Sequence, residues 1–292
     1  MHNSWIYLNG KLILGNEASI SPYDHGFLYG HGLFETMRVY KGRVFYFVEH
    51  VKRLHAGMKI LGWPSCPSVD ELSKAIYQTL QKNDLQEATV RLTISRGTGA
   101  SRPDPATCGG PTVIVFAAPI QPLGDDAYER GWSLATVNIR RNLTSPLCVV
   151  KAANYLDNIV AKSEAKDKGA NEALLLNNMD QVAEGTMCNL FLVVEGRLIT
   201  PDKKSGLLPG ITRDIVLELA RQAGITIEER QVSPDELLRA SEIFITSSLL
   251  EIMAVTTLDG RKVNQGRRGN MTAFLRRQYQ KHIQEWLSII RV

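Results

Sequence analysis

The sequence predicts a mixed α and β protein with two domains, and three observations support this prediction. Val90, Leu92 and Ile94 alternate with polar residues, which is the pattern of a half-buried strand. From Glu49 onward the apolar residues recur at helical spacing. The segment Pro119–Gly124 contains two prolines and a glycine, which resist regular structure, so we expect a linker there.

The expected division is therefore a small α+β domain over residues 1–118, a linker over 119–125 and a larger domain over 126–292. In the small domain, Asn9-Gly10 and Lys41-Gly42 are turn dipeptides between predicted strands. Ser68 and Glu71 have the spacing of a capping box at the start of a helix.

The remaining elements follow from hydrophobic periodicity. Further strands are expected at residues 34–40, 44–47, 111–118, 132–139, 172–176, 190–194 and 242–246. Helices of the larger domain are expected at residues 154–168, 212–223 and 272–284.

Composition narrows the functional class. Hydrophobic residues make up 44% of the chain and charged residues 22%, which is ordinary for a globular protein, and a net charge of +4 is too small to indicate nucleic-acid binding. No apolar window is long enough to span a membrane, and the N-terminus has no export-signal pattern. The four cysteines form no CxxC pair and the histidines have no metal-site spacing, so we expect reduced thiols, no metal and a cytoplasmic enzyme.

Two segments carry the candidate chemistry. Lys151 follows Val149 and Val150, and a lysine among apolar neighbours is a candidate for a lowered pKa and for imine chemistry with an aldehyde. Glu184, at the mouth of a predicted strand, can hold a proton on a heteroaromatic nitrogen. A Schiff-base lysine and an acidic partner for the pyridinium are what a pyridoxal phosphate site requires. Either residue alone is more commonly a solvated surface charge.

A phosphate dianion seeks a helix N-terminus with free N–H groups. Gly210, Ile211 and Thr212 offer one, because the glycine lets the backbone approach closely and a helical pattern follows. An ordinary helix start with Thr212 as the cap is the alternative. Tyr155 lies four residues after Lys151, a spacing that on a helix would place both side chains on one face.

The order of Lys151–Leu156, Glu184–Thr186 and Gly210–Arg213 resembles the class IV pyridoxal phosphate enzymes, also called fold type IV. This family includes branched-chain aminotransferases, D-amino acid aminotransferases and aminodeoxychorismate lyases. The resemblance runs from Tyr7 to Gly260. It implies a small α/β domain and a larger pseudo-barrel domain, pyridoxal 5'-phosphate as the cofactor, and a homodimer with shared sites at the domain junction.

The resemblance also implies roles for individual residues. Arg53 is expected to bind the cofactor phosphate and Tyr155 to hydrogen-bond its phenolic oxygen. Ser247 and Ser248 are expected to supply hydroxyl donors, and Ser248 is the better match. Positions expected near the substrate are Phe34, Thr36, Arg38, Arg96 and Arg102.

The reaction is less sharply indicated. We favour an aminotransferase acting on an amino acid of the branched-chain type and a 2-keto acid, because most of the family transaminates. Aminodeoxychorismate lyase, which releases pyruvate, is the alternative, since Gly32–Arg38 looks more like that pattern. Arg102 is followed two residues on by Asp104 rather than histidine, so D-specific activity is in doubt. A non-catalytic cofactor-binding protein is disfavoured by the intact Lys151 and Glu184.

Candidates for a loop shared between subunits are the segment 29–34 and Arg102. Phe27, Leu28 and Tyr29 crowd apolar groups into a glycine-rich segment, which favours an interface. The alternative is that these residues pack the core of the small domain.

Overall fold

The structure, a computed structural model, describes residues 4–289. It divides into two compact units, each with its own sheet. Unit 1 extends to Gln121 and also includes Val150–Tyr155, and unit 2 comprises Pro122–Val149 and the chain from Leu156 onward.

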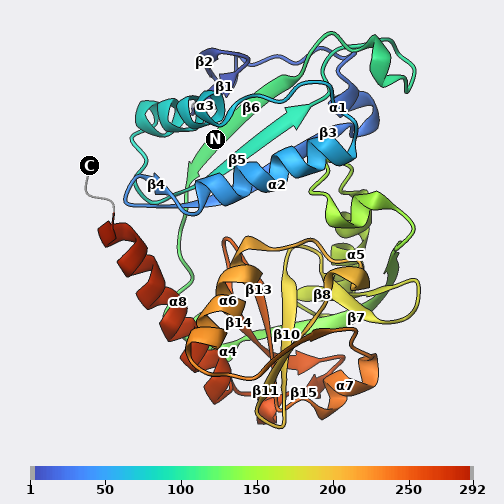
Figure 1. The fold of residues 1–292 in the computed structure, drawn as a ribbon, viewed down its shortest axis with the longest axis vertical. Coiled ribbons are helices and arrows are strands. Elements are labelled where there is room, and N and C mark those ends of the chain that lie inside the picture. The colour runs from blue at the N-terminus through green and yellow to red at the C-terminus, as the bar shows by residue number, and fades with distance from the viewer. Residues whose placement is uncertain (1–3, 290–292) are drawn as a thin grey trace. The chain divides into compact units, whose positions relative to one another are not determined.

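Unit 1 is built on a six-stranded antiparallel sheet with the order β2-β1-β6-β5-β3-β4. Helix α2 packs on β3, and α3 packs on β1 and β6 (Figure 1). The bounds of the elements are β1 (Trp5–Leu8), β2 (Lys11–Leu14), α1 (His25–Tyr29), β3 (Gly32–Tyr40), β4 (Arg43–Val44), α2 (Phe47–Ile60), α3 (Val69–Lys82), β5 (Ala88–Ser95) and β6 (Thr112–Pro119).

Local sequence signals account for several boundaries in unit 1. The predicted turn at Asn9-Gly10 is confirmed: both residues have positive φ, 47° and 92°, as a tight hairpin requires. The capping box is confirmed too, since Ser68 and Glu71 satisfy each other's backbone N–H groups. The strand expected over residues 44–47 is wrong beyond Val44. Tyr46 adopts a left-handed conformation with φ 53° and serves as the N-cap of α2.

The segment Val150–Tyr155 belongs to unit 1 because its backbone pairs with β3. The amide of Phe34 donates to the carbonyl of Lys151 at 3.0 Å, and the amide of Ala153 donates to the carbonyl of Gly32 at 2.7 Å. The expected helix from residue 154 therefore starts later, at Leu156, after this extended pairing has ended.

Unit 2 is built on a mixed nine-stranded sheet whose main path runs β12-β11-β10-β13-β14-β7-β8-β9, with β15 paired to β14. Helix α5 packs on β7 and β8, whereas α6 and α8 pack together over β13 (Figure 1). The bounds are α4 (Asp125–Arg130), β7 (Trp132–Arg141), α5 (Leu156–Asp167), β8 (Glu172–Asn177), β9 (Val182–Gly185), β10 (Asn189–Val194), β11 (Arg197–Pro201), α6 (Ile211–Gln222), β12 (Ile227–Arg230), α7 (Pro234–Arg239), β13 (Glu242–Ser247), β14 (Glu251–Leu258), β15 (Arg261–Lys262) and α8 (Asn270–Ile289).

The nine-stranded sheet curls into a half-barrel, because β9 at one end of the path returns to contact β11. Its interior is a large apolar core that includes Leu174, Leu190 and Ile245, all almost fully buried. A smaller core lies under α5, where Ala161 and Ala165 pack against β7 and β8. The predicted mixed fold with a small domain and a pseudo-barrel is confirmed in these two sheets.

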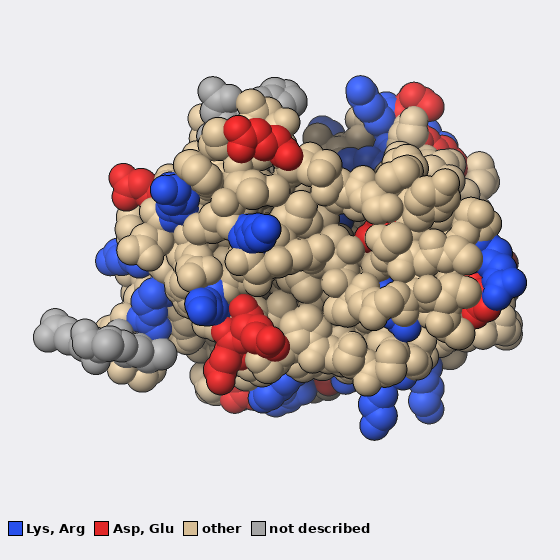
Figure 2. Space-filling model, turned by 90° about the horizontal axis from the view of Figure 1, so that it is seen from above, with Lys and Arg blue, Asp and Glu red and all other residues tan. Residues whose placement is uncertain are grey.

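The surface shown in Figure 2 carries Lys and Arg side chains in small groups interspersed with Asp and Glu, and large uncharged areas lie between them. Within residues 4–289, no helix is long and apolar enough to cross a membrane. All four cysteines are free thiols.

Candidate active site

Lys151 is held over aromatic rings in unit 1. Its Nζ lies 4.5 Å from the centroid of the Phe34 ring and 5.8 Å from that of the Tyr155 ring. The two rings meet edge to face at 5.3 Å. Ring faces attract an ammonium group and keep bulk water from one side of it. The expected proximity of Tyr155 to Lys151 therefore exists, and Phe34 joins the two within a single unit.

The route by which Tyr155 reaches Lys151 differs from the helical stacking that the four-residue spacing predicted. Both residues precede α5, in the extended segment that pairs with β3. A turn bond from the amide of Tyr155 to the carbonyl of Ala153, 2.8 Å long, then folds the tyrosine back toward Phe34. The helical interpretation is wrong because the backbone of this segment forms hydrogen bonds with β3 instead of helical ones.

Arg91 joins this cluster, although the sequence did not single it out. Its guanidinium carbon lies 3.8 Å from the centroid of the Phe34 ring, and its Cα pairs with that of Thr36 across the sheet. Partial burial lowers the pKa of Arg91, and the nearby Tyr155 acts in the opposite direction. In the sequence Arg91 looks like an ordinary outward-facing residue of an alternating strand. Only the register in which β5 pairs with β3 shows that it lies beside Phe34.

Arg53, the predicted phosphate ligand, is anchored by a buried carboxylate. Glu35 accepts from Arg53 Nε at 2.8 Å and Nη2 at 2.5 Å, and from His50 Nδ1 at 2.7 Å. Burial by itself would raise the pKa of Glu35, but the charges and hydrogen bonds of Arg53 and His50 hold it down at about 2. The carboxylate is thus ionised throughout the physiological range and fixes one edge of the guanidinium. Neither Glu35 nor His50 was predicted.

The other expected substrate residues are dispersed over unit 1. Thr36 lies on the same face of β3 as Phe34 and Arg38, since alternate residues of a strand share a face. The Arg38 guanidinium is engaged by Glu87 at 2.6 Å, at the far end of β3 from Phe34. Arg96 is buried just after β5. Arg102 is exposed in an ion pair with Asp104 at 3.2 Å. Among the five, Phe34 belongs to the Lys151 cluster, and Thr36 lies two residues further along the same face of β3.

Glu184 is the centre of a second cluster, in unit 2. The side chain is 7% exposed, and its Oε1 lies 3.2 Å from Arg141 Nη2. Its Oε2 accepts from the amide of Leu208 at 3.0 Å and from Asn189 Nδ2 at 3.4 Å. Leu175 pairs with Glu184 whereas Leu176 pairs with Val182, so β9 carries one extra residue directly before Glu184. Such a bulge re-aims the side chain that follows it.

Arg141 and Asn189 were not predicted, yet they hold Glu184 in place. Arg141 also donates from Nη2 to the carbonyl of Cys148 at 2.5 Å and from Nε to that of Gly206 at 3.1 Å. Asn189 Nδ2 donates to the carbonyl of Leu208 at 2.8 Å. No local motif marks these residues, because the contact of Arg141 with Glu184 depends on how the strands of unit 2 come together.

The start of α6 is suited to an anion. Gly210 is its N-cap and no side chain caps the first amides. A Cβ at Gly210 would lie 1.9 Å from Asn189 Oδ1, so only glycine fits there. Thr212 lies inside the helix, and the alternative that it is the cap is wrong. Uncapped amides at a helix N-terminus bind phosphate.

The hairpin after β13 carries the two predicted serines. Ser247 Oγ accepts from the amide of Leu250 at 3.2 Å, which shapes this turn, and Ser248 lies within it. The preceding Thr246 is 1% exposed, and its hydroxyl has no hydrogen-bond partner within residues 4–289. Buried hydroxyl groups without a partner are uncommon in folded proteins.

Unit 1 thus carries a primary amine over aromatic rings, and unit 2 carries a buried carboxylate and a helix start whose first amides no side chain caps. The model of the amino-transferase class IV family matches residues 32–258, and the chain belongs to this family. The predicted membership among class IV pyridoxal phosphate enzymes is thereby confirmed.

Relatives of the chain are named as enzymes of the same family. The chain is 39% identical to a putative branched-chain-amino-acid aminotransferase of Methanocaldococcus jannaschii, over 96% of this chain and 97% of the relative. It is 34% identical to the branched-chain-amino-acid aminotransferase of Escherichia coli, over 92% and 89% respectively. It is also 33% identical to the aminodeoxychorismate lyase of Bacillus subtilis, over 97% and 96%.

Solved structures show the same fold. The E. coli branched-chain amino acid aminotransferase superposes with a TM-score of 0.89 at 33% identity, covering 94% of this chain and 93% of that one. The branched-chain amino acid aminotransferase of Thermobaculum terrenum, solved in its PLP-bound holo-form, has a TM-score of 0.85 at 28% identity, covering 97% and 95%. The predictions of an enzyme and of pyridoxal phosphate as its cofactor are confirmed at the level of the family.

Proposed function

We propose that this protein is a pyridoxal phosphate-dependent aminotransferase that moves an amino group between a branched-chain amino acid and a 2-keto acid. The observation that carries the proposal is the Lys151 amine held over the rings of Phe34 and Tyr155. Relatives named branched-chain aminotransferases cover at least 92% of the chain, which supports this substrate class.

The residues fit the chemistry of the cofactor. Its aldehyde needs a primary amine, which Lys151 offers. Its pyridine nitrogen needs an acid partner, and Glu184 is a carboxylate fixed by three donors in a buried place. Its phosphate needs a cationic fork and free amides, which Arg53 and the Gly210–Thr212 segment offer on their respective units.

When bound, the cofactor supplies an electron sink for the electrons of a broken bond at the substrate α-carbon. Lys151 acts as general base when it removes the proton from the α-carbon. It acts as general acid when it returns the proton to the carbon on the other side of the substrate nitrogen. Phe34 and Tyr155 orient the amine and exclude water from one side of it. Glu184 holds a proton on the ring nitrogen. Arg91, beside Phe34, provides a positive charge for a substrate carboxylate.

Aminodeoxychorismate lyase is the second candidate. It is supported by the 33% identity to the Bacillus subtilis lyase, which covers nearly all of both chains. The same amine and carboxylate would serve that reaction, with pyruvate as the leaving product. D-amino acid transamination has less support, because Arg102 is paired with Asp104 rather than with a histidine at that position.

One experiment separates these activities. The purified protein, loaded with pyridoxal phosphate, is incubated with L-leucine, L-valine or D-alanine plus 2-oxoglutarate, and separately with aminodeoxychorismate. We expect glutamate to form with the L-branched-chain substrates. Pyruvate and 4-aminobenzoate from aminodeoxychorismate, without glutamate from the amino acids, would overturn the proposal in favour of the lyase.

We also propose that the working unit is a cytoplasmic homodimer. Each unit exposes apolar groups that a second copy would cover: Phe27 (76% exposed) in unit 1, and Leu156 (68%) and Ile159 (60%) on α5 of unit 2. Leu33 and Phe34, in contrast, are core residues of unit 1, so that part of the predicted interface segment is internal. The four free thiols fit a reducing compartment. Light scattering of the purified protein tests the assembly.

A further inference from the structure

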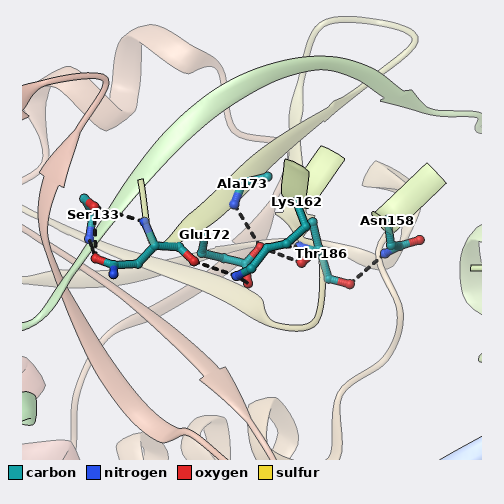
Figure 3. Close-up of polar contacts among 7 residues, drawn as sticks. Ser133, Asn158, Lys162, Glu172, Ala173 and Thr186 are labelled. Atoms are coloured by element: carbon teal, nitrogen blue, oxygen red, sulfur yellow. Dashed lines mark hydrogen bonds and ion pairs between the residues drawn. The ribbon is translucent and has the colours of Figure 1, made fainter. Parts of the chain in front are cut away.

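Glu172, the first residue of β8, is a carboxylate with no solvent exposure. Its Oε1 accepts from the amide of Ala173 at 2.8 Å, the amide of Thr186 at 3.2 Å and the hydroxyl of Thr186 at 2.5 Å. Its Oε2 forms an ion pair with Lys162 Nζ at 2.8 Å. Figure 3 shows these donors converging on one carboxylate.

A fully buried carboxylate is strongly destabilising unless it is paired and hydrogen-bonded. Glu172 meets this requirement, but a pair of apolar residues would fill the same space without the cost of burying a charge. In some proteins a buried polar or ionic group is retained because it fixes one geometry. The question is therefore which part of unit 2 Glu172 fixes.

The answer is the end of β9 that carries Glu184. Thr186 follows Glu184 by two residues, and its amide and hydroxyl are both bound by Glu172. Its carbonyl accepts from Asn158 Nδ2 of α5 at 2.6 Å (Figure 3). All the polar groups of Thr186 are thus occupied.

Gly185, the residue between Glu184 and Thr186, is tightly packed. A Cβ at Gly185 would lie 2.4 Å from Cys188 Sγ and 3.3 Å from Glu172 Cγ. The amide of Gly185 closes the turn by donating to the carbonyl of Cys188 at 2.8 Å. Burial, together with the charges of Glu172 and Glu184, raises the pKa of the Cys188 thiol, so both carboxylates act on this one turn.

We propose that Glu172 is a positioning residue for Glu184. Through Thr186 it clamps the C-terminal end of β9, while the bulge at Ala183 and Arg141 set the direction of the Glu184 carboxylate. The proposal rests on the proposed function, in which Glu184 holds the proton on the ring nitrogen of the cofactor. Loosening the clamp lets the carboxylate drift from that nitrogen, and a displacement of about 1 Å at a catalytic group costs on the order of a hundredfold in rate.

The test uses Thr186→Val, which keeps the shape of the side chain and removes only the hydroxyl donor to Glu172. Thr186→Ser restores the hydroxyl and serves as the conservative rescue. A matched control exists in the same unit: Thr272, at the start of α8, donates its amide and hydroxyl to Glu242 at 2.8 and 2.7 Å. Glu242 begins β13, at the opposite end from Ser247, so Thr272→Val removes an equivalent bond away from the hairpin that carries the two serines. Glu172→Gln is the complementary change.

Three quantities are measured for each variant: the melting temperature, kcat and KM for L-leucine, and the pH midpoint of the visible absorption change of the bound cofactor without substrate. We expect Thr186→Val and Thr272→Val to lower the melting temperature by similar amounts. Only Thr186→Val and Glu172→Gln should lower kcat, by about tenfold to a hundredfold with KM little changed, and shift the absorption midpoint. Thr186→Ser should restore kcat and the absorption midpoint to their wild-type values.

Equal melting losses with unchanged kcat and unchanged absorption midpoint in Thr186→Val would overturn the proposal and leave Glu172 a structural residue. If Glu172→Gln does not fold, Thr186→Val still decides. Full activity of Glu184→Gln would instead overturn the role of Glu184 in the proposed function, so the two failures are distinguishable.

Discussion

Arg141 lies 3.2 Å from the Glu184 carboxylate and bonds, with the same guanidinium, to the carbonyl groups of Cys148 and Gly206. One side chain at the end of β7 therefore ties together the strand that presents Glu184, the segment preceding Lys151, and the loop that leads to α6. In a buried place such a network holds the carboxylate in a single orientation.

The first prediction concerns the charge of Glu184. Glu184→Gln keeps the shape and removes the negative charge that holds a proton on the ring nitrogen, so kcat should fall. A loss of about 2–4 kcal/mol of transition-state stabilisation corresponds to tens-fold to several-hundredfold in rate. Steady-state kinetics with L-leucine measures this, and KM should change little. Glu242→Gln, which alters a carboxylate that caps α8, is the control.

The second prediction concerns Lys151. Loaded protein should be yellow, and borohydride should fix the cofactor covalently to Lys151, as peptide mass mapping can establish. Lys151→Ala should abolish turnover but retain some cofactor affinity, because Arg53 and the α6 amides still bind the phosphate. Label found on Lys162 would contradict the assignment; in this structure Lys162 is occupied by Glu172.

The third prediction is a pH dependence of stability that originates in Glu35. Its pKa falls from 4.5 to about 2 on folding, so the carboxylate contributes stability that is fully present above pH 4.5 and is lost as the pH falls toward 2. The shift corresponds to roughly 3 kcal/mol. Urea unfolding of wild type and Glu35→Gln at several pH values between 7 and 3 should show the difference shrinking on acidification. A pH-independent difference would mean that Glu35 acts by packing alone.

The fourth prediction tests shared sites in the proposed homodimer. Phe34 belongs to the Lys151 cluster of its own chain, so we test Tyr29, which begins the segment 29–34, and Arg102 as residues of a loop contributed by the other subunit. An inactive Lys151→Ala chain mixed with an inactive Arg102→Ala or Tyr29→Ala chain should recover about a quarter of wild-type activity, since half of random dimers are hybrids with one intact site of two. Absence of recovery with either loop variant would argue against sharing.

Several elements follow directly from local sequence. The hairpin at Asn9-Gly10 and the start of α3 at Ser68 are decided by residues within four positions of one another, so pattern and structure agree. Strands β9, β11, β12 and β14 carry no clear alternation, because most of them are buried on both faces, and the sequence did not predict them. The predicted start of α5 is too early. Val150–Tyr155 pairs with β3, which lies more than a hundred residues earlier in the chain, and local periodicity does not reveal such a contact.

For the site, the sequence by itself singled out the two residues to which we assign the chemistry. Lys151 and Glu184 lie in short segments whose residue types and order are characteristic of one family, and chemistry that depends on a single side chain leaves such a local trace. The tertiary structure alone decided what holds them. Phe34 lies beside the amine and Arg91 lies over the Phe34 ring, while Glu35 binds Arg53 and Arg141 binds Glu184, and these residues come from different strands and helices. Their roles arise from register and burial, which exist only once the sheets have formed, so no spacing along the chain could reveal them.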